Sequence, residues 1–241
     1  GTPDLDDPDG YSDRQVFING DVTLLGEFVR SGHTTIAGGA HTINVGLTKD
    51  FVLSPVSGRV RIYGIHFEGS NQYAIEVFRC SGLEIVGNRI SNVVSEFQLG
   101  IAILVHGGGS EKWITGKVKI AGNIIEGGSA VRSDAILVAD LAVDADIAFN
   151  RITDVESIAG IIVIRQFEGK VRIASNFISP GPGHGPEASG YGVYVFANAT
   201  WDDTRTSSPR FEIVDNRIVA VNPEATGIGL VGDSTTIDAP L

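Results

Sequence analysis

A short phrase that returns along the chain constrains its fold more than any other feature. Each copy has two apolar residues around a variable one, then a bend, usually with an asparagine, and a second apolar stretch. Copies occupy residues 83–90, 118–125, 145–152, 171–178 and 211–218, with a diverged copy at 60–67. The slot of the asparagine recurs after 23, 35, 27, 26 and 40 residues, so one unit has about 25 residues. Repeats of this size predict a solenoid in which each copy belongs to one coil.

The second position of the phrase carries a charge whose sign alternates from copy to copy. The residues are Arg61, Glu84, Lys119, Asp146, Arg172 and Glu212. If the copies are parallel strands in register, about 4.8 Å apart, each charge lies between two opposite charges. The positions on either side of the charge are apolar, which is typical of a half-buried strand. The phrase therefore predicts a stack of parallel strands.

An asparagine follows the bend in all but the first copy. The residues are Asn88, Asn123, Asn150, Asn176 and Asn216, with Ile65 in the same slot of the first copy. Asparagine tolerates the strained backbone of a tight bend, and its amide can bond to neighbours above and below. We expect an internal asparagine ladder at this turn and a structural role for these residues.

A second phrase alternates with the first, at 74–79, 100–105, 135–140, 160–165, 192–197 and 227–232. Aligned on their first residues, the copies place Ile75, Ile101 and Ile136 in one inward slot. Two outward columns follow from this alignment. One is Phe78, Leu104, Ala139, Ile164, Phe196 and Val231, and the other is Glu76, Ala102, Leu137, Ile162, Tyr194 and Gly229. Parallel strands that are apolar on both faces are usually covered on both faces.

Two alternatives remain for what covers this outward apolar face. One is the chain's own loops or its N-terminal segment, and the other is a second subunit or a partner protein, because so large a patch seldom faces water. The residues predicted to form such an interface are Phe78, Leu104, Leu137, Ile162, Ile164, Tyr194 and Phe196.

The composition of the chain limits the classes of binding partner that we expect. The net charge of −11 in 241 residues argues against nucleic acid or an anionic membrane as a partner. No apolar run approaches membrane-spanning length, and no signal peptide is recognised in this chain. Residues 1–14 are acidic and turn-rich and are interpreted as a linker, so that 15–241 form a single domain. Residues 7–10 imitate part of a calcium loop, but Leu5 occupies a ligand position, so we predict no cofactor and keep calcium as a weak alternative.

Two phrases in each coil, with an asparagine at the bend, resemble the right-handed parallel β-helix of the pectate-lyase-like superfamily. The resemblance covers residues 16 to 237 and implies an all-β, single-stranded solenoid of about eight coils. Members of that superfamily are commonly secreted or surface proteins that cleave, epimerise or bind acidic polysaccharides, so the resemblance implies an extracellular or cell-surface location. Phage tailspikes and adhesins share the coil, and a fold alone does not assign a function.

The hydrolase signatures of that superfamily are not matched. Gly183-His184-Gly185 lies in a proline- and glycine-rich loop, and the Asp202-Asp203 pair follows that histidine instead of preceding it. No dense acidic cluster on consecutive coils suggests the calcium site of a lyase. Whether the protein is an enzyme stays open; an enzyme of this kind would be a polysaccharide lyase, hydrolase or epimerase.

Loop lengths point to a candidate groove. Two coils carry insertions at the same corner, at residues 106–117 and 198–210, and both tryptophans of the protein, Trp113 and Trp201, lie in them. The two coils are three rungs apart, so the loops are expected about 14 Å apart. Exposed tryptophan on such loops suits stacking on a sugar ring. The alternative is that the two tryptophans are lids over the apolar face.

The floor of this groove supplies the candidate site residues. Asp140 and Arg165 occupy equivalent slots on neighbouring coils and should pair, either as an inert ion pair or as a general base held by a guanidinium. His106, at the root of the first loop, is the candidate acid–base partner, or else an ordinary hydrogen-bonding loop residue. The residues predicted to bind substrate are Trp113, Trp201, Asp144, Gln166 and Glu168, with Leu141 and Phe167 on the same floor.

Two functions follow from these patterns. The first is an extracellular domain that binds, and in a stronger form processes, a polysaccharide between the two loops. The second is a non-catalytic scaffold that associates with itself through its apolar outer face and its open coil ends.

Overall fold

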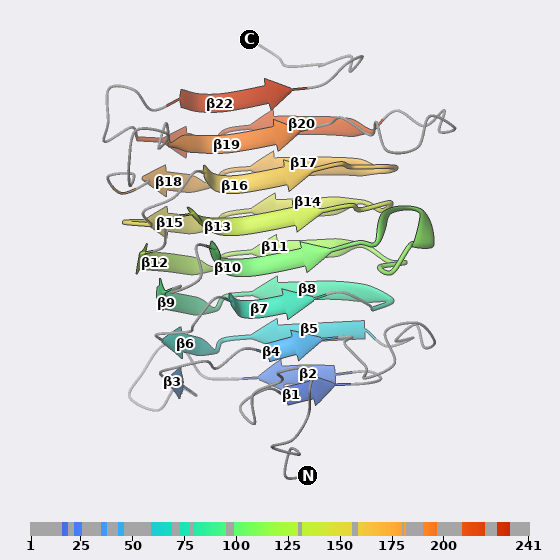
Figure 1. Ribbon diagram of the computed structural model, residues 1–241, viewed down its shortest axis with the longest axis horizontal. Coiled ribbons are helices and arrows are strands. Elements are labelled where there is room, and N and C mark those ends of the chain that lie inside the picture. Colours follow the sequence, from blue (N-terminus) through green and yellow to red (C-terminus); the bar gives the residue numbers. More distant parts are fainter. Residues whose placement is uncertain are drawn as a thin grey trace.

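The computed structural model describes residues 16–18, 22–25, 35–37, 43–45, 59–68, 73–77, 80–94, 99–129, 132–155, 159–179, 181, 190–196, 209–219 and 226–231. These residues form parallel strands in three sheets, as in a parallel β-helix (Figure 1). Each coil contributes one strand to each sheet in turn. The single described helical segment is the 3₁₀ turn η1 (Gly109–Glu111).

Sheet A consists of the strands that carry the second phrase and faces the viewer in Figure 1. In spatial order they are β1 (Val16–Ile18), β4 (Ile43–Val45), β7 (Tyr73–Val77), β10 (Leu99–His106), β13 (Arg132–Ala139), β16 (Ala159–Ile164), β19 (Tyr191–Phe196) and β22 (Thr226–Val231).

Sheets B and C carry the two halves of the first phrase. Sheet B is β2 (Val22–Leu25), β5 (Arg59–Tyr63), β8 (Gly82–Val86), β11 (Val118–Ala121), β14 (Ala145–Ala148), β17 (Lys170–Ala174) and β20 (Arg210–Val214). Sheet C is β3 (Thr35–Ala37), β6 (His66–Glu68), β9 (Arg89–Val94), β12 (Ile124–Ser129), β15 (Arg151–Thr153), β18 (Phe177–Ser179) and β21 (Arg217–Ile218).

The alternating charges of sheet B lie in register, as predicted. Glu84 pairs with Arg61 on one side and Lys119 on the other, and the alternation continues to Glu212. Ion-pair contacts join Arg61 to Glu84 at 3.6 Å and Arg172 to Asp146 at 3.0 Å. Exposed pairs of this kind add little free energy of folding each, but a register slipped by one coil would bring like charges together. The column therefore specifies the register more than it stabilises the fold.

The predicted alignment of sheet A is wrong at β10, where the observed register differs from the prediction by two residues. Ile103, not Ile101, pairs with Ile75 and Ile136, and Leu104 pairs with Glu76 and Leu137. The alignment failed because Gly100 and Ala102 both suit the small first slot of the phrase, and Ile101 and Ile103 both fit an inward slot; in the structure Ala102 stands opposite Ala135. As a consequence His106 is the last residue of β10 and pairs with Ala139 in the outward column, where the sequence alignment had placed Leu104.

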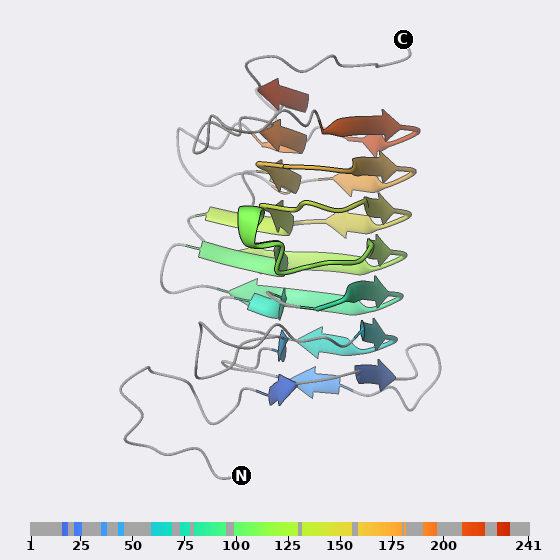
Figure 2. The same ribbon diagram turned by 90° about the vertical axis from the view of Figure 1, so that its right-hand side faces the viewer.

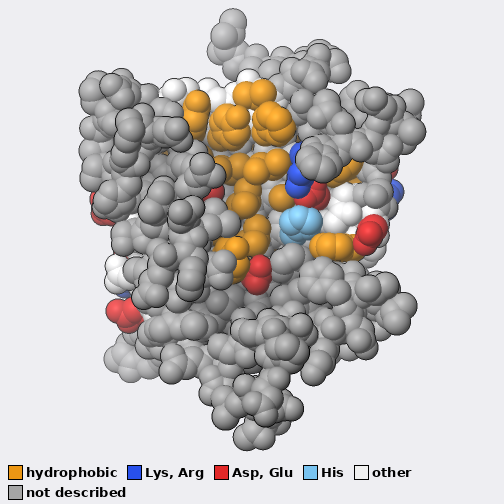
Figure 3. Space-filling model, in the orientation of Figure 1, with side chains coloured by type: hydrophobic (Ala, Val, Ile, Leu, Met, Phe, Trp, Pro, Cys, Tyr) orange, Lys and Arg blue, Asp and Glu red, His pale blue; other side chains and the backbone are white. Residues whose placement is uncertain are grey.

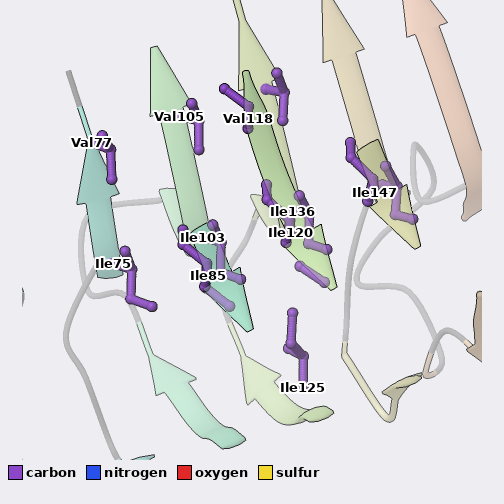
Figure 4. Close-up of a cluster of buried hydrophobic side chains, with 14 of the residues drawn as sticks. Ile75, Val77, Ile85, Ile103, Val105, Val118, Ile120, Ile125, Ile136 and Ile147 are labelled. Carbon is purple, nitrogen blue, oxygen red and sulfur yellow. The ribbon is translucent and has the colours of Figure 1, made fainter. Parts of the chain in front are cut away.

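The core is formed by the inward side chains of all three sheets. Ile75, Ile103 and Ile136 of sheet A face Ile85, Ile120 and Ile147 of sheet B, with Ile125 of sheet C beside them (Figure 4). All of these side chains are buried. Burying a side chain of this size contributes roughly 1.5–3 kcal/mol, so each coil is stabilised chiefly by contact with its neighbours.

Small residues at the start of the second phrase allow sheet A to approach sheet C. A Cβ at Gly160 would lie 2.5 Å from Ile178 Cγ2, and a Cβ at Gly192 would lie 2.5 Å from Ile218 Cγ2. At Gly227, on the last strand of the stack, the same Cβ would meet nothing within 4 Å. The recurrent Gly or Ala of the phrase is thus explained by packing against an isoleucine of sheet C.

The asparagines after the bend bond to one another along the stack. Asn123 Nδ2 donates to Asn150 Oδ1 at 3.0 Å and to the carbonyl of Ile85 at 2.9 Å, while its own Oδ1 accepts from the backbone N–H and Nδ2 of Asn88. The same contacts continue from Asn150 to Asn176 and from Asn176 to Asn216. Ile65 lacks an amide but still donates its backbone N–H to Asn88 Oδ1. These bonds satisfy polar groups that are buried inside the coil.

Asn123→Ala should lower the free energy of unfolding by about 3 kcal/mol, because it leaves the buried carbonyl of Ile85 and the buried N–H of Asn88, both on the preceding coil, without partners. Asn216→Ala is the matched control: Asn216 is only half-buried, lies on the last coil of the column, and should cost about 1 kcal/mol. Urea unfolding of both variants measures the difference. Equal losses would show that the column does not act through burial.

Candidate functional site

The candidate catalytic residues meet where three neighbouring strands of sheet A end. His106 is the last residue of β10, Asp140 follows β13, and Arg165 follows β16. Backbone bonds continue one residue past the strands, since Asp140 N donates to Ile164 O at 2.9 Å and Arg165 N to Phe196 O at 2.8 Å. Asp140 and Arg165 then take the left-handed conformation, with φ of 57° and 53°. Two non-glycine residues in that region indicate that the corner is held firmly by its surroundings.

The carboxylate of Asp140 lies between His106 and Arg165. Its Oδ2 accepts a hydrogen bond from Arg165 Nη2 at 2.7 Å and lies 2.9 Å from His106 Nε2. Arg165 Nε is 2.7 Å from Oδ1, although its N–H does not point along a hydrogen bond. The predicted pairing of Asp140 with Arg165 is therefore confirmed, and His106 joins it from the opposite side.

The electrostatics of Asp140 favour its charged form. Burial alone would raise the pKa of its carboxyl, but the hydrogen bonds and positive charge of His106 and Arg165 outweigh burial and hold that pKa below its usual value. A carboxylate with a lowered pKa is a weak general base, because it gives up stabilising contacts when it takes a proton. This arrangement suits a fixed anchor better than a proton carrier.

Both ring nitrogens of His106 are engaged. Nε2 faces Asp140 at 2.9 Å, and Nδ1 accepts a long hydrogen bond of 3.4 Å from the backbone N–H of Gly108. In this conformation His106 has no ring nitrogen directed at an incoming substrate, so the contacts that it makes are structural.

The loop after His106 folds back onto the next two coils instead of standing away from them. Gly109 N donates to Asp140 O at 2.8 Å, and Lys112 Nζ lies 3.0 Å from Glu168 Oε2. Figure 2 shows η1 raised from the level of β10 toward the level of β13. A Cβ at Gly109 would approach the ring of Phe167 to 3.0 Å, and the φ of this glycine is 56°, so glycine lets the loop lie close to that ring.

Trp113 closes this loop against His106. The centroids of the two rings are 5.3 Å apart with their planes inclined at 37°, and the indole packs directly on Gly108, where a Cβ would overlap the ring. The indole Nε1 donates to Glu111 Oε2. The return of the loop is held by Cys80, whose N–H donates to Trp113 O and whose carbonyl accepts from Thr115 N, both at 3.2 Å. Trp113 is half-buried, so part of its indole stays accessible at the border of sheet A.

The predicted groove floor is covered in this structure. Leu141 belongs to the core, and Phe167 is buried under the loop. Gln166, predicted to bind substrate, is 1% exposed, and its amide donates to the carbonyls of Val143 and Glu168. That prediction is corrected, because a side chain enclosed by its own corner does not reach a ligand. The prediction failed because it assumed that the loop stands up as a wall.

The remaining predicted substrate contacts fall into two groups. Asp144 is exposed but accepts the backbone N–H of Lys170 at 2.8 Å, which joins two coils, and Glu168 is half-buried beside Lys112. Both keep surface for a ligand, and their binding role stays a prediction. Trp201, most of the 198–210 loop and Phe78 lie outside the described residues, as do the linker prediction for 1–14 and the calcium alternative in it.

The residues predicted for an interface differ in exposure. Leu104 and Ile162 are 8% and 6% exposed, so they have little surface left to lose on association, and their assignment is corrected. Leu137, Ile164, Tyr194 and Phe196 are half-buried. The ring of Tyr194 packs against that of Tyr191, with the ring centroids 4.9 Å apart. Figure 3 shows an apolar strip along sheet A, with acidic, basic and histidine side chains gathered at its right border.

Two carboxyl groups with raised pKa values, on half-buried Glu76 and buried Asp134, were missed in the sequence. Burial raises the pKa of Glu76 to about 7, with the positive charge of His106 opposing the shift. Burial also raises the pKa of Asp134 to about 7, opposed by a hydrogen bond from Ala159 N. The available signal was an acidic residue within an otherwise apolar column, which indicates a carboxyl removed from water.

Comparison of the chain with protein-family models, curated proteins and solved structures gives no match. Among the described residues, no group of three or more His, Cys, Asp or Glu side chains is arranged to hold a metal ion. The described part of the chain also has no helix long and apolar enough to cross a membrane.

The raised pKa values predict that stability falls as the pH rises from about 4.5 to about 7. In that window the unfolded chain releases protons from Glu76 and Asp134, whereas the folded protein retains them, so their contribution is full below the unfolded pKa and lost through the folded one. Asp140 acts oppositely at lower pH, since its lowered pKa stabilises the fold only above its unfolded value.

Urea unfolding at about pH 5 and about pH 8 measures this fall in the wild type and in the double variant Glu76→Gln, Asp134→Asn. The variant should lose most of the difference between the two pH values. An unchanged pH dependence would assign the fall to other groups.

Proposed function

We propose that the outer face of sheet A binds a polysaccharide chain at the border formed by Trp113, Asp140 and Arg165. The observation that carries this proposal is the half-buried indole of Trp113 beside a fixed carboxylate–guanidinium pair. An aromatic face stacks on the apolar face of a sugar ring, while neighbouring charged groups bond its hydroxyls. The apolar strip of sheet A continues this surface (Figure 3).

The proposal is for binding, with processing as its stronger form. Processing by Asp140 or His106 would require one of them to release a partner, since each is engaged on both sides. The lowered pKa of Asp140 also speaks against it as a general base. Polysaccharide binding needs neither change.

The finer fold assignment belongs to the same proposal. We infer a right-handed coil of the pectate-lyase-like kind, with about eight turns, and an extracellular or cell-surface location. The support is the two-phrase repeat together with three parallel sheets. Since one fold hosts many functions, the binding proposal rests on the side chains at the border and not on this assignment.

Trp113→Ala should weaken polysaccharide binding about tenfold or more, because loss of one stacked ring typically costs more than 1 kcal/mol. Trp113→Phe keeps a ring and should retain part of the affinity. Lys112→Gln, in the same loop, removes only the exposed pair with Glu168 and should bind like the wild type. Affinity electrophoresis in gels with neutral and acidic polysaccharides measures all three.

If the wild type is retarded by no polysaccharide, or if Trp113→Ala is retarded as strongly as the wild type, the proposal fails. Thermal unfolding of Trp113→Ala separates a lost contact from a lost fold.

Self-association is the second candidate, favoured by a specific exposure pattern. Ile228 and Leu230 occupy inward slots of β22 yet are 45% and 39% exposed, because no further described strand lies beyond β22. The outer face of sheet A offers a second apolar surface, formed by half-buried Leu137, Ile164, Tyr194 and Phe196, and exposed Val231 of β22 continues the column of Phe196. Patches of this kind often mark protein contacts.

Ile164→Asp should shift an assembled form toward monomer in light scattering, since it places a charge in the apolar strip. Phe149→Asp is the control: Phe149 is 65% exposed at the corner between sheets B and C, away from the strip. A wild type that is monomeric at high concentration, or a loss of assembly in both variants alike, would contradict the use of this face.

A further inference from the structure

A second surface with unused binding groups lies on sheet C. Its strands stack one outward column in register, with the order His66, Arg89, Ile124, Arg151, Phe177 and Arg217. Three arginines and a histidine in one column stand out in a chain whose net charge is −11. The strands β15 and β18, which carry Arg151 and Phe177, lie at the left of Figure 1.

The two halves of this column differ in how their polar groups are satisfied. In the lower half, Arg89 forms an ion pair with Glu126, and His66 Nε2 lies 2.8 Å from Ser91 Oγ. In the upper half, Arg151 and Arg217 are exposed, and among the described residues no carboxylate lies within ion-pair distance of either guanidinium. Arg61, Arg89, Arg165 and Arg172, by contrast, each contact a carboxylate.

Phe177 holds these two guanidinium groups in place. Arg151 Cζ lies 5.1 Å from the centroid of the Phe177 ring, and Arg217 Cζ lies 5.6 Å from it. Cation–π contacts of this type fix the side chains but leave the N–H donors of each guanidinium unused. Because their strands flank β18, the two arginines are two strand spacings apart, about 9.6 Å.

We propose that Arg151, Phe177 and Arg217 bind an acidic polysaccharide through the carboxylates of its uronic acid units, an inference that rests on the proposed function for the kind of polymer but not for the place. Each guanidinium receives one carboxylate through paired N–H donors, which is the geometry that arginine recognises best. Between them, the edge of the half-buried Phe177 ring, whose faces the two guanidinium groups approach, contacts the apolar side of the intervening sugar.

The spacing matches an extended polymer of β-1,4-linked sugars. In such a chain consecutive units face opposite ways, so carboxylates on one side recur once per disaccharide, a repeat comparable to two strand spacings. Val219, which follows β21, is exposed and adds apolar surface beside the column. A single small anion would use one arginine and leave the second without a role.

Nucleic acid fits this surface less well. Its binding depends on several cations following a dense row of phosphates. Here the exposed carboxylates of Asp154 and Asp215 are close in sequence to the two arginines, and the whole chain is strongly acidic. Two isolated positive groups suit a polymer with one charge per sugar.

The test measures binding of a β-1,4-linked mannuronate oligosaccharide by titration calorimetry at low and at moderate salt. Arg151→Gln and Arg217→Gln should each weaken binding about fivefold, Phe177→Ala should weaken it by a similar factor, and added salt should weaken the wild type. Arg89→Gln removes a charge from the same column but from a paired arginine, and it should bind like the wild type. A cello-oligosaccharide of equal length should lose no affinity in the arginine variants.

Several outcomes would overturn the inference. One is a wild type that does not bind the mannuronate probe, and another is an Arg89→Gln variant as weak as the other two, which would mean that net charge alone decides. Equal or tighter binding of a single-stranded oligonucleotide with the same residue dependence would assign the surface to nucleic acid. If Trp113→Ala loses polysaccharide binding while the three sheet C variants do not, the proposed function stands and this inference falls; the reverse result separates them the other way.

Discussion

The fold depends on the in-register stacking of equivalent residues from coil to coil. No coil buries its own apolar residues or pairs its own strands, because each strand bonds only to the strands of the coils before and after it. The asparagine column also requires coils to stack in register, since every buried amide in it bonds to a neighbouring coil. Apolar packing supplies most of the stabilisation, while charge and amide columns decide which coil lies next to which.

Stacking also determines which side chains become neighbours at the surface. His106, Asp140 and Arg165 are far apart in the sequence but lie at the ends of adjacent strands, and Arg151, Phe177 and Arg217 share one column of sheet C. The two sets differ in chemistry. In the first, Asp140 holds both His106 and Arg165, and the three form a fixed border for Trp113. In the second, the guanidinium donors have no carboxylate among the described residues, which leaves them available to a ligand.

Most of the architecture could be predicted from the sequence because a repeat states each rule several times. The alternating charges and the apolar pairs predicted parallel strands in register, and the equivalent slots of the second phrase predicted the contact between Asp140 and Arg165. The alignment of β10 could not be decided, because Ile101 and Ile103 both satisfy an inward slot and only the neighbouring strands choose between them. Local pattern alone does not resolve a shift of two residues, since such a shift keeps every side chain on the same face.

The candidate site was predicted less well, for a physical reason. Loops do not repeat, so the length of the 106–117 insertion indicated an excursion but not its direction. The loop turned back because glycines at 108 and 109 let the backbone approach Trp113 and Phe167 closely, and this buried Gln166. Burial likewise raised the pKa of Glu76 and of Asp134, which the sequence signalled only by an acid among apolar neighbours.

Because the charges of sheet B alternate in sign, the loss or gain of one coil has a different effect from the loss or gain of two. Loss of the coil that carries Lys119 would bring Glu84 against Asp146, two like charges, whereas loss of that coil together with the next would bring Glu84 against Arg172. Duplication obeys the same arithmetic, because one extra coil repeats a sign and two extra coils do not. In the evolution of such chains, coils should therefore be gained or lost most easily in pairs, and the gain or loss of a single coil should be selected against.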